Sequence, residues 1–369
     1  MKTLILNATQ KLKIYFIFIG SIFMLYGYPA MADEDCQSSG DLGYVCGPQN
    51  AEDALQLGNS QWLITSGLDG SFTKTDIPGH IYLVNHREKS FEVLFPGTDP
   101  VFKQDMKMFA DCPGPINPEK FAAHGLALKA QSADRYRLYM TSHGEREAIE
   151  VFDIDARGDK PAIAWMGCVL LPEKMWANSI AILSDGGFVT TKFMDPTVQD
   201  AFAGIMQGNI SGSVYEWHPG GKVTEIPGTA LSGPNGIVVS PDDRWIYVAA
   251  TGTHEVVRFD RTANPVTRES TEVTVRADNV RWGDDGMLYT VGGNYVDPAD
   301  CPSMPCNTGW SVISIDPQTL SAKRVTGVDQ TAALQGASSV VPVGNEFWIG
   351  TYGGDRIGYM PRSAASGKN

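Results

Sequence analysis

The sequence has no cluster of basic residues and no sustained helical pattern. The first absence bears on the kind of binding partner, and the second bears on the fold. Lys and Arg number 29 against 42 Asp and Glu, which leaves a formal net charge of −13. Because proteins hold nucleic-acid phosphates mainly through clustered Lys and Arg, this composition argues against a nucleic-acid partner. A cation is a better match for such an acidic chain than a polyanion.

Several familiar catalytic motifs are also missing. The sequence contains no G-x-S-x-G elbow, no phosphate-binding glycine loop and no dinucleotide fingerprint at a strand-to-helix junction. Nucleophilic serine chemistry is therefore not expected. The cysteines show no C-x-x-C spacing, which argues against a thiolate zinc site.

The N-terminal segment, residues 1–32, has the pattern of a secretory signal peptide. Three lysines precede an apolar run from Ile14 to Tyr28, and the run is followed by Ala30-Met31-Ala32. Small residues at this spacing predict cleavage before Asp33 and export to the periplasm or the extracellular space. The alternative is an uncleaved anchor, and a membrane partner is expected only in that case.

All six cysteines follow the signal segment, where an oxidising compartment permits disulfides. The pairing of six cysteines is not deducible from sequence. We expect a short bridge between Cys301 and Cys306, whereas a free buried thiol is the alternative for Cys168. The six residues are Cys36, Cys46, Cys112, Cys168, Cys301 and Cys306.

The rest of the chain repeats a unit of short strands and turns. In the clearest unit, which starts at Asn235, strands are predicted at Ile237–Val239, Trp245–Ala249 and Glu255–Phe259. Similar units recur roughly every 40 to 70 residues, the range of propeller blades with variable loops. They start at Glu52, His124, Asn178, Asp278 and Ser338. We therefore predict an all-β fold, a single six-bladed β-propeller over residues 33–369.

Polar residues occupy the same position in each repeat, where the innermost strand of the blade begins. In a propeller these positions converge on the central axis. They are Glu52 with Asp53, His124, Asn178, Asn235, Asp278 with Asn279, and Ser338 or Ser339. Carboxylate and amide oxygens without thiolates are the ligands of a hard cation, so the pattern predicts a central Ca²⁺ site.

Two histidines of one repeat are candidates for proton transfer. His124 begins the inner strand and His143 ends the next strand, so the two imidazoles can lie side by side. A histidine is a suitable general base near neutral pH, and a second one behind it can orient the first. Asp278 is a rival base or nucleophile, and the sequence does not decide between them.

At these residues the sequence resembles the paraoxonase family, a branch of the calcium-dependent six-bladed propellers that also includes the gluconolactonase and senescence-marker proteins. The matching segments are Glu52-Asp53 with Thr65-Ser66-Gly67, His124-Gly125, Leu138-Tyr139 leading to His143, Asn178, Pro234-Asn235-Gly236-Ile237 with Ser240-Pro241-Asp242, Asp278-Asn279, and Gly336 onward with Trp348-Ile349-Gly350-Thr351.

The resemblance implies roles for individual residues. A catalytic calcium would be held by Glu52, Asn178, Asn235, Asp278 and Asn279. Asp53 would help to hold a second, structural calcium deeper in the channel, and His124 with His143 would form a catalytic dyad. The implied activity is hydrolysis of lactones, with aryl esters and sometimes phosphotriesters as further substrates.

The sequence departs from the family pattern at three places. Ser179 stands where paraoxonases carry an acid, Gly292 or Gly293 stands where they carry a further active-site histidine, and no cysteine follows Cys306. The main prediction is a secreted calcium-dependent lactonase or arylesterase that acts on a small-molecule lactone or ester. The alternatives are a calcium-stabilised propeller that binds without turnover, and a metal-independent enzyme like strictosidine synthase.

Overall fold

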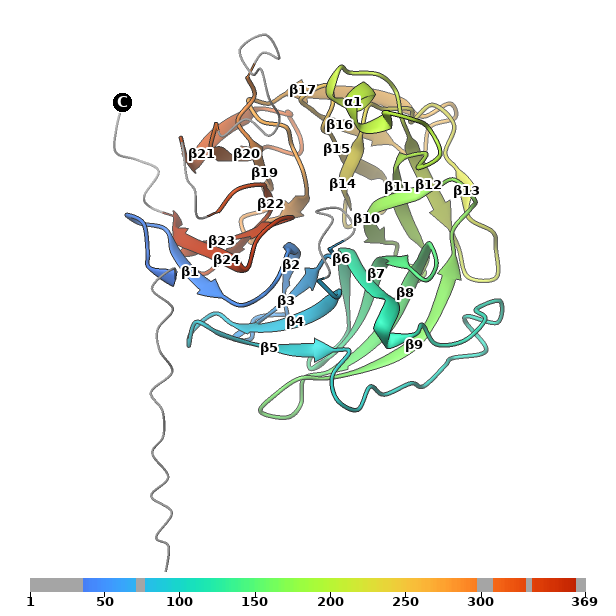
Figure 1. Ribbon diagram of the computed structural model, residues 1–369. Helices are drawn as coiled ribbons and strands as arrows, with labels where there is room; N and C mark the ends of the chain where they lie inside the picture. The colour runs from blue at the N-terminus through green and yellow to red at the C-terminus, as the bar shows by residue number, and fades with distance from the viewer. Residues whose placement is uncertain (1–35, 71–76, 297–307, 330–333, 363–369) are drawn as a thin grey trace, which may run out of the picture. The chain divides into compact units, whose positions relative to one another are not determined.

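The structure is a computed structural model, and it describes residues 36–70, 77–296, 308–329 and 334–362. Within these ranges the strands form six four-stranded antiparallel sheets, which surround a common centre as the blades of a propeller (Figure 1). The predicted six-bladed all-β fold is confirmed. The predicted signal segment, and the predicted bridge between Cys301 and Cys306, lie outside the described residues.

Each blade runs from an inner strand at the centre to an outer strand at the rim. The strands of the first three blades are β2 (Ala51–Gln56), β3 (Trp62–Gly67), β4 (His80–Asn85) and β5 (Ser90–Phe95); β6 (Phe121–Ser132), β7 (Arg135–Gly144), β8 (Ala148–Asp155) and β9 (Ala162–Leu170); and β10 (Trp176–Ile182), β11 (Phe188–Met194), β12 (Ser213–Trp217) and β13 (Thr224–Glu225).

The other three blades follow the same order, except that the last one takes its outer strand from the beginning of the chain. Their strands are β14 (Pro234–Val239), β15 (Trp245–Ala250), β16 (Glu255–Asp260) and β17 (Thr267–Glu272); β18 (Val280–Trp282), β19 (Leu288–Gly293), β20 (Trp310–Ile315) and β21 (Ala322–Val328); and β22 (Ala337–Val343), β23 (Glu346–Thr351), β24 (Arg356–Pro361) and β1 (Gly43–Cys46).

Strand β1 closes the ring. It pairs antiparallel with β24, from Gly43 opposite Tyr359 to Cys46 opposite Arg356. The inner strands also contact one another in sequence around the centre, and β22 contacts β2. Since no blade is left with an open inner edge, residues on the six inner strands share one central space.

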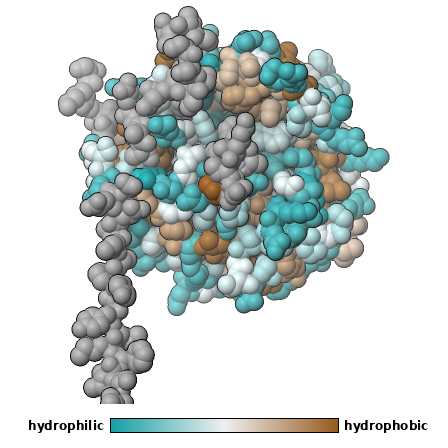
Figure 2. Space-filling model, viewed as in Figure 1, coloured by the Kyte–Doolittle hydropathy of each residue, from teal (hydrophilic) through white to brown (hydrophobic). Residues whose placement is uncertain are grey.

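Helices contribute little to the described part of the chain. The 3₁₀ turn η2 (Pro118–Lys120) precedes β6, and α1 (Ala201–Met206) lies in the connection between β11 and β12. No helix among the described residues has the length and apolarity needed to cross a membrane. Figure 2 shows hydrophobic residues on the surface in small groups among hydrophilic ones.

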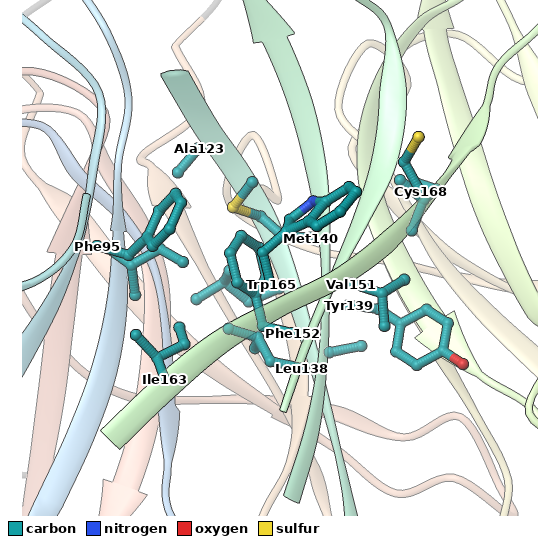
Figure 3. Close-up of a cluster of buried hydrophobic side chains, with 14 of the residues drawn as sticks. Phe95, Ala123, Leu138, Tyr139, Met140, Val151, Phe152, Ile163, Trp165 and Cys168 are labelled. Atoms are coloured by element: carbon teal, nitrogen blue, oxygen red, sulfur yellow. The ribbon is translucent and has the colours of Figure 1, made fainter. Parts of the chain in front are cut away.

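The hydrophobic core lies between and within the blades, because alternate residues of each inner and middle strand are apolar. Figure 3 shows one such cluster, in which Phe95, Phe152 and Trp165 are fully buried. Burial of each large side chain contributes on the order of 2–3 kcal/mol. The outer strand β17 is polar and reads TRESTE, which suits an exposed sheet edge.

Two disulfides fasten long connections to the blades. Cys36 pairs with Cys46 in β1, and Cys112 pairs with Cys168 in β9. The second bridge ties the connection between the first two blades to the rim of the second blade. The alternative of a free thiol at Cys168 is therefore wrong, because the apolar segment around it packs against the loop that carries Cys112.

The inner strands share an irregularity that positions the polar residues. In five blades the register between the inner strand and its neighbour shifts at the predicted site residues, between Ala51 and Asp53, for example, and between Ala177 and Ile180. Such bulges leave a residue unpaired and turn its side chain. In these five blades the site residues thus lie at bulges one to three residues inside the inner strand, whereas the repeat had predicted them at its first residue; Asp278 and Asn279 directly precede β18.

Candidate metal and catalytic site

The inner strands surround a cavity of about 630 Å³. It is lined by Glu52, His124, Asn178, Asn235 and Asp278, each from a different blade. One wall is apolar and comes from the third blade and its α1 connection; it consists of Trp176, Phe193, Phe202, Ala203 and Met206. The convergence that the repeat predicts is thus present in the structure.

Close packing of the blades at this point depends on glycine. A Cβ on Gly125 would lie 2.4 Å from the carbonyl oxygen of Asn178, and one on Gly236 would lie 2.6 Å from that of Asp278. Hydroxyl groups also join neighbouring blades: Thr141 Oγ1 donates to the carbonyl of Asn178 at 2.7 Å. These contacts fix the backbone of the site residues, so their side chains start from defined positions.

Four acceptor oxygens at the centre have no donor. They are buried, and within the described part of the chain no hydrogen-bond partner reaches them; they are Glu52 Oε2, Asn178 Oδ1, Asn235 Oδ1 and Asn279 Oδ1. An unsatisfied buried polar atom costs on the order of 1–3 kcal/mol. Native proteins rarely gather four such atoms without a bound ion or water that satisfies them.

The amide of Asn279 shows how one of these oxygens is kept free. Its Nδ2 donates to Glu52 Oε1 at 2.7 Å, which engages one oxygen of the carboxylate and leaves Oε2 open. Because the amide nitrogen is engaged in that bond, Asn279 Oδ1 is the atom left without a partner.

The surroundings of the carboxyl groups at this centre disfavour their ionised forms. Burial raises the pKa of Glu52 well above its usual value, and the negative charges of Asp53 and Asp278 raise it further. Removal from bulk solvent raises the pKa of Asp278 to about 8. A nearby cation would favour the ionised form of both groups.

The residues of this centre fit a bound Ca²⁺. The free atoms are carboxylate and amide oxygens, which is the ligand chemistry of that ion. No group of three or more His, Cys, Asp or Glu side chains around one point is found in the described ranges, so the amides of Asn178, Asn235 and Asn279 are essential to such a site. The soft ligands that favour other metals are absent from the set.

One step deeper in the channel, Asp53 has its partners within the protein. Its Oδ1 accepts the backbone N–H of Ala54 at 2.8 Å and its Oδ2 accepts that of Leu126 at 2.7 Å. Arg281 Nη2 donates to Asp53 Oδ2 and forms a buried ion pair with it. Burial still raises the pKa of Asp53, although these donors oppose the shift.

This deeper layer does not fit a second cation. The side chain of Asp53 already accepts three donors, and a guanidinium occupies the position next to it. Ser179 stands where the resemblance to paraoxonases would place an acid, and it supplies no further negative charge to balance a second cation. No local pattern in the sequence indicates Arg281 in this role, because its side chain meets Asp53 across the centre of the ring, between blades that are not neighbours.

The two predicted histidines lie side by side at the edge of the cavity. His124 Nδ1 is 2.8 Å from His143 Nε2, and His143 Nδ1 is 2.9 Å from Glu147 Oε1. Trp176 stacks on His143, with ring centroids 4.7 Å apart and planes 7° from parallel. His124 Nε2 lies 3.8 Å from Glu52 Oε2.

This chain of hydrogen bonds determines the tautomers. A carboxylate only accepts, so His143 donates from Nδ1, and its Nε2 accepts the Nδ1 proton of His124. The lone pair of His124 Nε2 is then available on the side of Glu52. Burial lowers the pKa of His124 well below its usual value, and His143 adds to the shift, so His124 is neutral.

Two of these partners were missed by the sequence analysis. Glu147 lies four residues after His143, in the turn between β7 and β8, and an acid at that distance was a usable signal. Trp176 precedes Asn178 at the start of β10 and reads as an ordinary core residue. The other four histidines, His80, His86, His218 and His254, do not line the cavity.

These features define a class: a six-bladed propeller with an oxygen-rich polar centre on its axis. The family comparison agrees, since the family model for the SMP-30/gluconolactonase/LRE-like region matches residues 132–326, more than half of the chain. The chain belongs to this family. The superfamily resemblance seen in the sequence is thereby confirmed. No curated protein sequence matches the chain.

Solved structures show the same fold at low sequence identity. A luciferin-regenerating enzyme has 14% identity and a TM-score of 0.53 over 86% of this chain and 93% of that chain. A gluconolactonase from Xanthomonas campestris has 18% identity and a TM-score of 0.51, with coverages of 87% and 88%. Regucalcin from Agrobacterium tumefaciens, a calcium-binding protein, has 11% identity and a TM-score of 0.50, with coverages of 86% and 91%.

Proposed function

We propose that the protein is a calcium-dependent hydrolase of lactones or aryl esters. The observation that carries the proposal is the set of four buried oxygens that no described donor reaches, beside a histidine whose free nitrogen lies 3.8 Å from one of them. The family and its gluconolactonase member support the reaction class. The proposed ligands of a single Ca²⁺ are Glu52, Asn178, Asn235, Asp278 and Asn279.

A single cation agrees with the charges of the three acidic site residues. Glu52, Asp53 and Asp278 carry three negative charges when ionised, and Arg281 neutralises one of them through its ion pair with Asp53. The remaining two match a divalent ion. When bound, Ca²⁺ would supply a positive charge that polarises the substrate carbonyl and stabilises the developing oxyanion.

The histidines supply proton transfer in this proposal. His124 Nε2 removes a proton from a water molecule as the water oxygen bonds to the carbonyl carbon. His143 holds the imidazole of His124 in the required tautomer, and Glu147 stabilises the positive charge as it develops. The bond between the carbonyl carbon and the leaving oxygen then breaks, and the proton on His124 passes to that oxygen.

Asp278 remains the rival to His124, as base or as nucleophile. Hydrolysis in ¹⁸O-labelled water under single-turnover conditions separates water attack from attack by the carboxylate. With water attack, the product acid contains ¹⁸O in the first turnover. Unlabelled acid in the first turnover would identify Asp278 as the nucleophile.

The apolar wall of Trp176, Phe193, Phe202 and Met206 supports substrates with an alkyl or aryl group. The decisive experiment is a panel of γ- and δ-lactones, aryl acetates and phosphotriesters, assayed with Ca²⁺ and with a chelator. We expect hydrolysis that the chelator abolishes and added Ca²⁺ restores. If no member of the panel gives chelator-sensitive turnover, the binding-only alternative replaces this proposal.

We also propose that the mature protein begins at Asp33 and functions outside the cytoplasm. Disulfides persist in oxidising compartments, and the two bridges support such a location. N-terminal sequencing of the protein from an exporting host tests the proposal, and an intact Met1 would contradict it.

A further inference from the structure

Besides the polar centre, the cavity contains a cation that has no counter-ion among the described residues. Arg276 lines the cavity together with Glu52, Asn178 and Asp278. Its Nη1 is buried and has no hydrogen-bond partner, and no ion pair joins its guanidinium to any described carboxylate. Burial lowers the pKa of Arg276. A guanidinium stays protonated in a protein, so no described residue of this wall compensates its charge.

The backbone around Arg276 is held in place, so the side chain is not on a loose loop. Its N–H donates to the carbonyl of Gly293 at 2.9 Å, and two residues later Asp278 N–H donates to that of Val291 at 2.9 Å. From the other side, Thr251 Oγ1 donates to the carbonyl of Ala277 at 2.7 Å. The segment continues the line of β18 along β19, with an isolated bridge between Val275 and Asn294.

This arrangement places Arg276 and Asp278 on the same side of the chain. Residues i and i+2 of an extended segment point to one face, and both side chains line the cavity. Tyr295 supports the guanidinium from outside, with its ring centroid 5.5 Å from Arg276 Cζ. The charge is therefore presented to the same cavity as the proposed metal ligands.

There is also room beside this charge. Gly293 and Gly309 line the cavity, and the nearest atom to a Cβ placed on Gly293 is 3.9 Å away. A side chain at this position would have filled the space. A ligand group can instead approach Arg276 through it.

We propose that Arg276 is an anion-binding subsite, and that the physiological substrate carries a carboxylate or another anionic group remote from the bond that is hydrolysed. The part of this proposal that concerns the substrate rests on the proposed hydrolase function. The fifth blade, which Arg276 precedes, lies across the ring from the second blade, which carries His124. A substrate with its ester at the centre would then place its anion toward Arg276 and its apolar part along the third blade.

The chemistry favours an anion because a guanidinium offers several N–H donors in one plane, which suits carboxylate and phosphate oxygens. Neutral hydroxyl groups would leave the charge uncompensated. Among the described cavity residues Arg276 is the only Lys or Arg, so its removal leaves no second cation in this set to take over.

A matched substrate pair tests the subsite. The substrates are 4-acetoxybenzoate and its neutral methyl ester, assayed with Ca²⁺, and the measured quantity is the ratio of their kcat/KM values. In the wild type we expect the anion to be preferred. The variant Arg276→Gln should lower the ratio of kcat/KM for the anion to kcat/KM for the methyl ester about tenfold or more, because a charge-assisted hydrogen bond is lost. The variant Arg276→Lys should retain part of the preference for the anion.

The control is Arg157→Gln, which removes one positive charge from an exposed position paired with Asp155. It should leave the ratio unchanged. An equal ratio in the wild type and in Arg276→Gln, with both esters hydrolysed, would overturn the subsite while leaving the hydrolase function intact.

A binding measurement covers the case in which neither ester is hydrolysed. Calorimetric titration with 4-hydroxybenzoate in the presence of a chelator reports on Arg276 without a cation at the centre. Binding by the wild type and Arg157→Gln but not by Arg276→Gln supports the anion subsite even where the hydrolase proposal fails. Equal binding, or none, by all three proteins argues against the subsite.

Discussion

Two neighbouring carboxylates on β2 meet opposite conditions. Glu52 faces the cavity, where one of its oxygens and three amide oxygens have no donor. Asp53, the next residue, turns into the deeper channel and accepts bonds from two backbone N–H groups and from Arg281. The upper layer, which contains Glu52, is incomplete without a ligand, whereas the Asp53 carboxylate of the deeper layer has its partners within the protein.

The difference shows where stability and function separate. A buried carboxylate whose donors lie within the protein contributes to the stability of the fold, because removal of one partner leaves a buried charge without compensation. An unsatisfied layer lowers stability and persists where a ligand compensates for it. The upper layer is therefore expected to respond to calcium, and the deeper layer to respond to mutation through folding.

The largest expected effect comes from removing one free oxygen in the upper layer. Asn178→Leu keeps a similar volume but removes a proposed ligand, so calcium affinity measured by titration calorimetry should fall at least 100-fold, and activity with it. The metal-free variant should unfold at the same or a higher denaturant concentration than the wild type, because an unsatisfied acceptor is gone. Unchanged calcium affinity would refute the ligand assignment.

The deeper layer should behave in the opposite way. Arg281→Met leaves Asp53 buried without its counter-ion, and we expect the free energy of unfolding to fall by about 3–5 kcal/mol. The double variant Asp53→Asn/Arg281→Met should recover much of this loss in the free energy of unfolding. Because the deeper layer does not fit a second cation, the wild-type protein should bind one Ca²⁺ per chain. Two tightly bound ions in the wild type would contradict the distinction between the layers.

The next effect concerns the histidine at the boundary of the upper layer. His124→Gln should lower kcat by about 100-fold, while calcium affinity stays near that of the wild type because His124 is not a proposed ligand. Kinetic and calorimetric measurements on the same preparation separate the two quantities. A near-normal kcat would transfer the role of base to Asp278.

The smallest effect is expected for Glu147, which contacts His143 and not the cavity. Glu147→Gln retains the size of the side chain but no longer stabilises positive charge on the imidazoles, and we expect kcat to fall about tenfold with little change in KM. Its pH–rate profile should shift relative to the wild type, which a purely structural role would not produce. An unaltered rate and profile would remove Glu147 from the mechanism.

Much of the fold could be predicted from the sequence, because strands and turns leave local patterns. The predicted strands Ile237–Val239, Trp245–Ala249 and Glu255–Phe259 fall within β14, β15 and β16. The polar residues at equal positions were visible for the same reason. The bulges that turn them toward the centre were not, since a bulge depends on pairing with the neighbouring strand.

The long-range contacts could not be predicted. Cys112 and Cys168 are 56 residues apart and meet only because a connection folds back over the second blade. Arg281 is separated from Asp53 by most of the chain, and Arg276 has no local partner that would mark it as a cavity residue. Only Glu147, four residues from His143, left a local signal that could have been used.

The sequence by itself determined the repeat, the six blades and the polar residues that each blade presents, because these properties follow from alternation and turn chemistry within short segments. The tertiary structure decided which of those residues keep free oxygens and which are satisfied. That decision depends on ring closure, which brings Arg281 to Asp53 and leaves no donor among the described residues for one oxygen of Glu52 and for the amide oxygens of Asn178, Asn235 and Asn279.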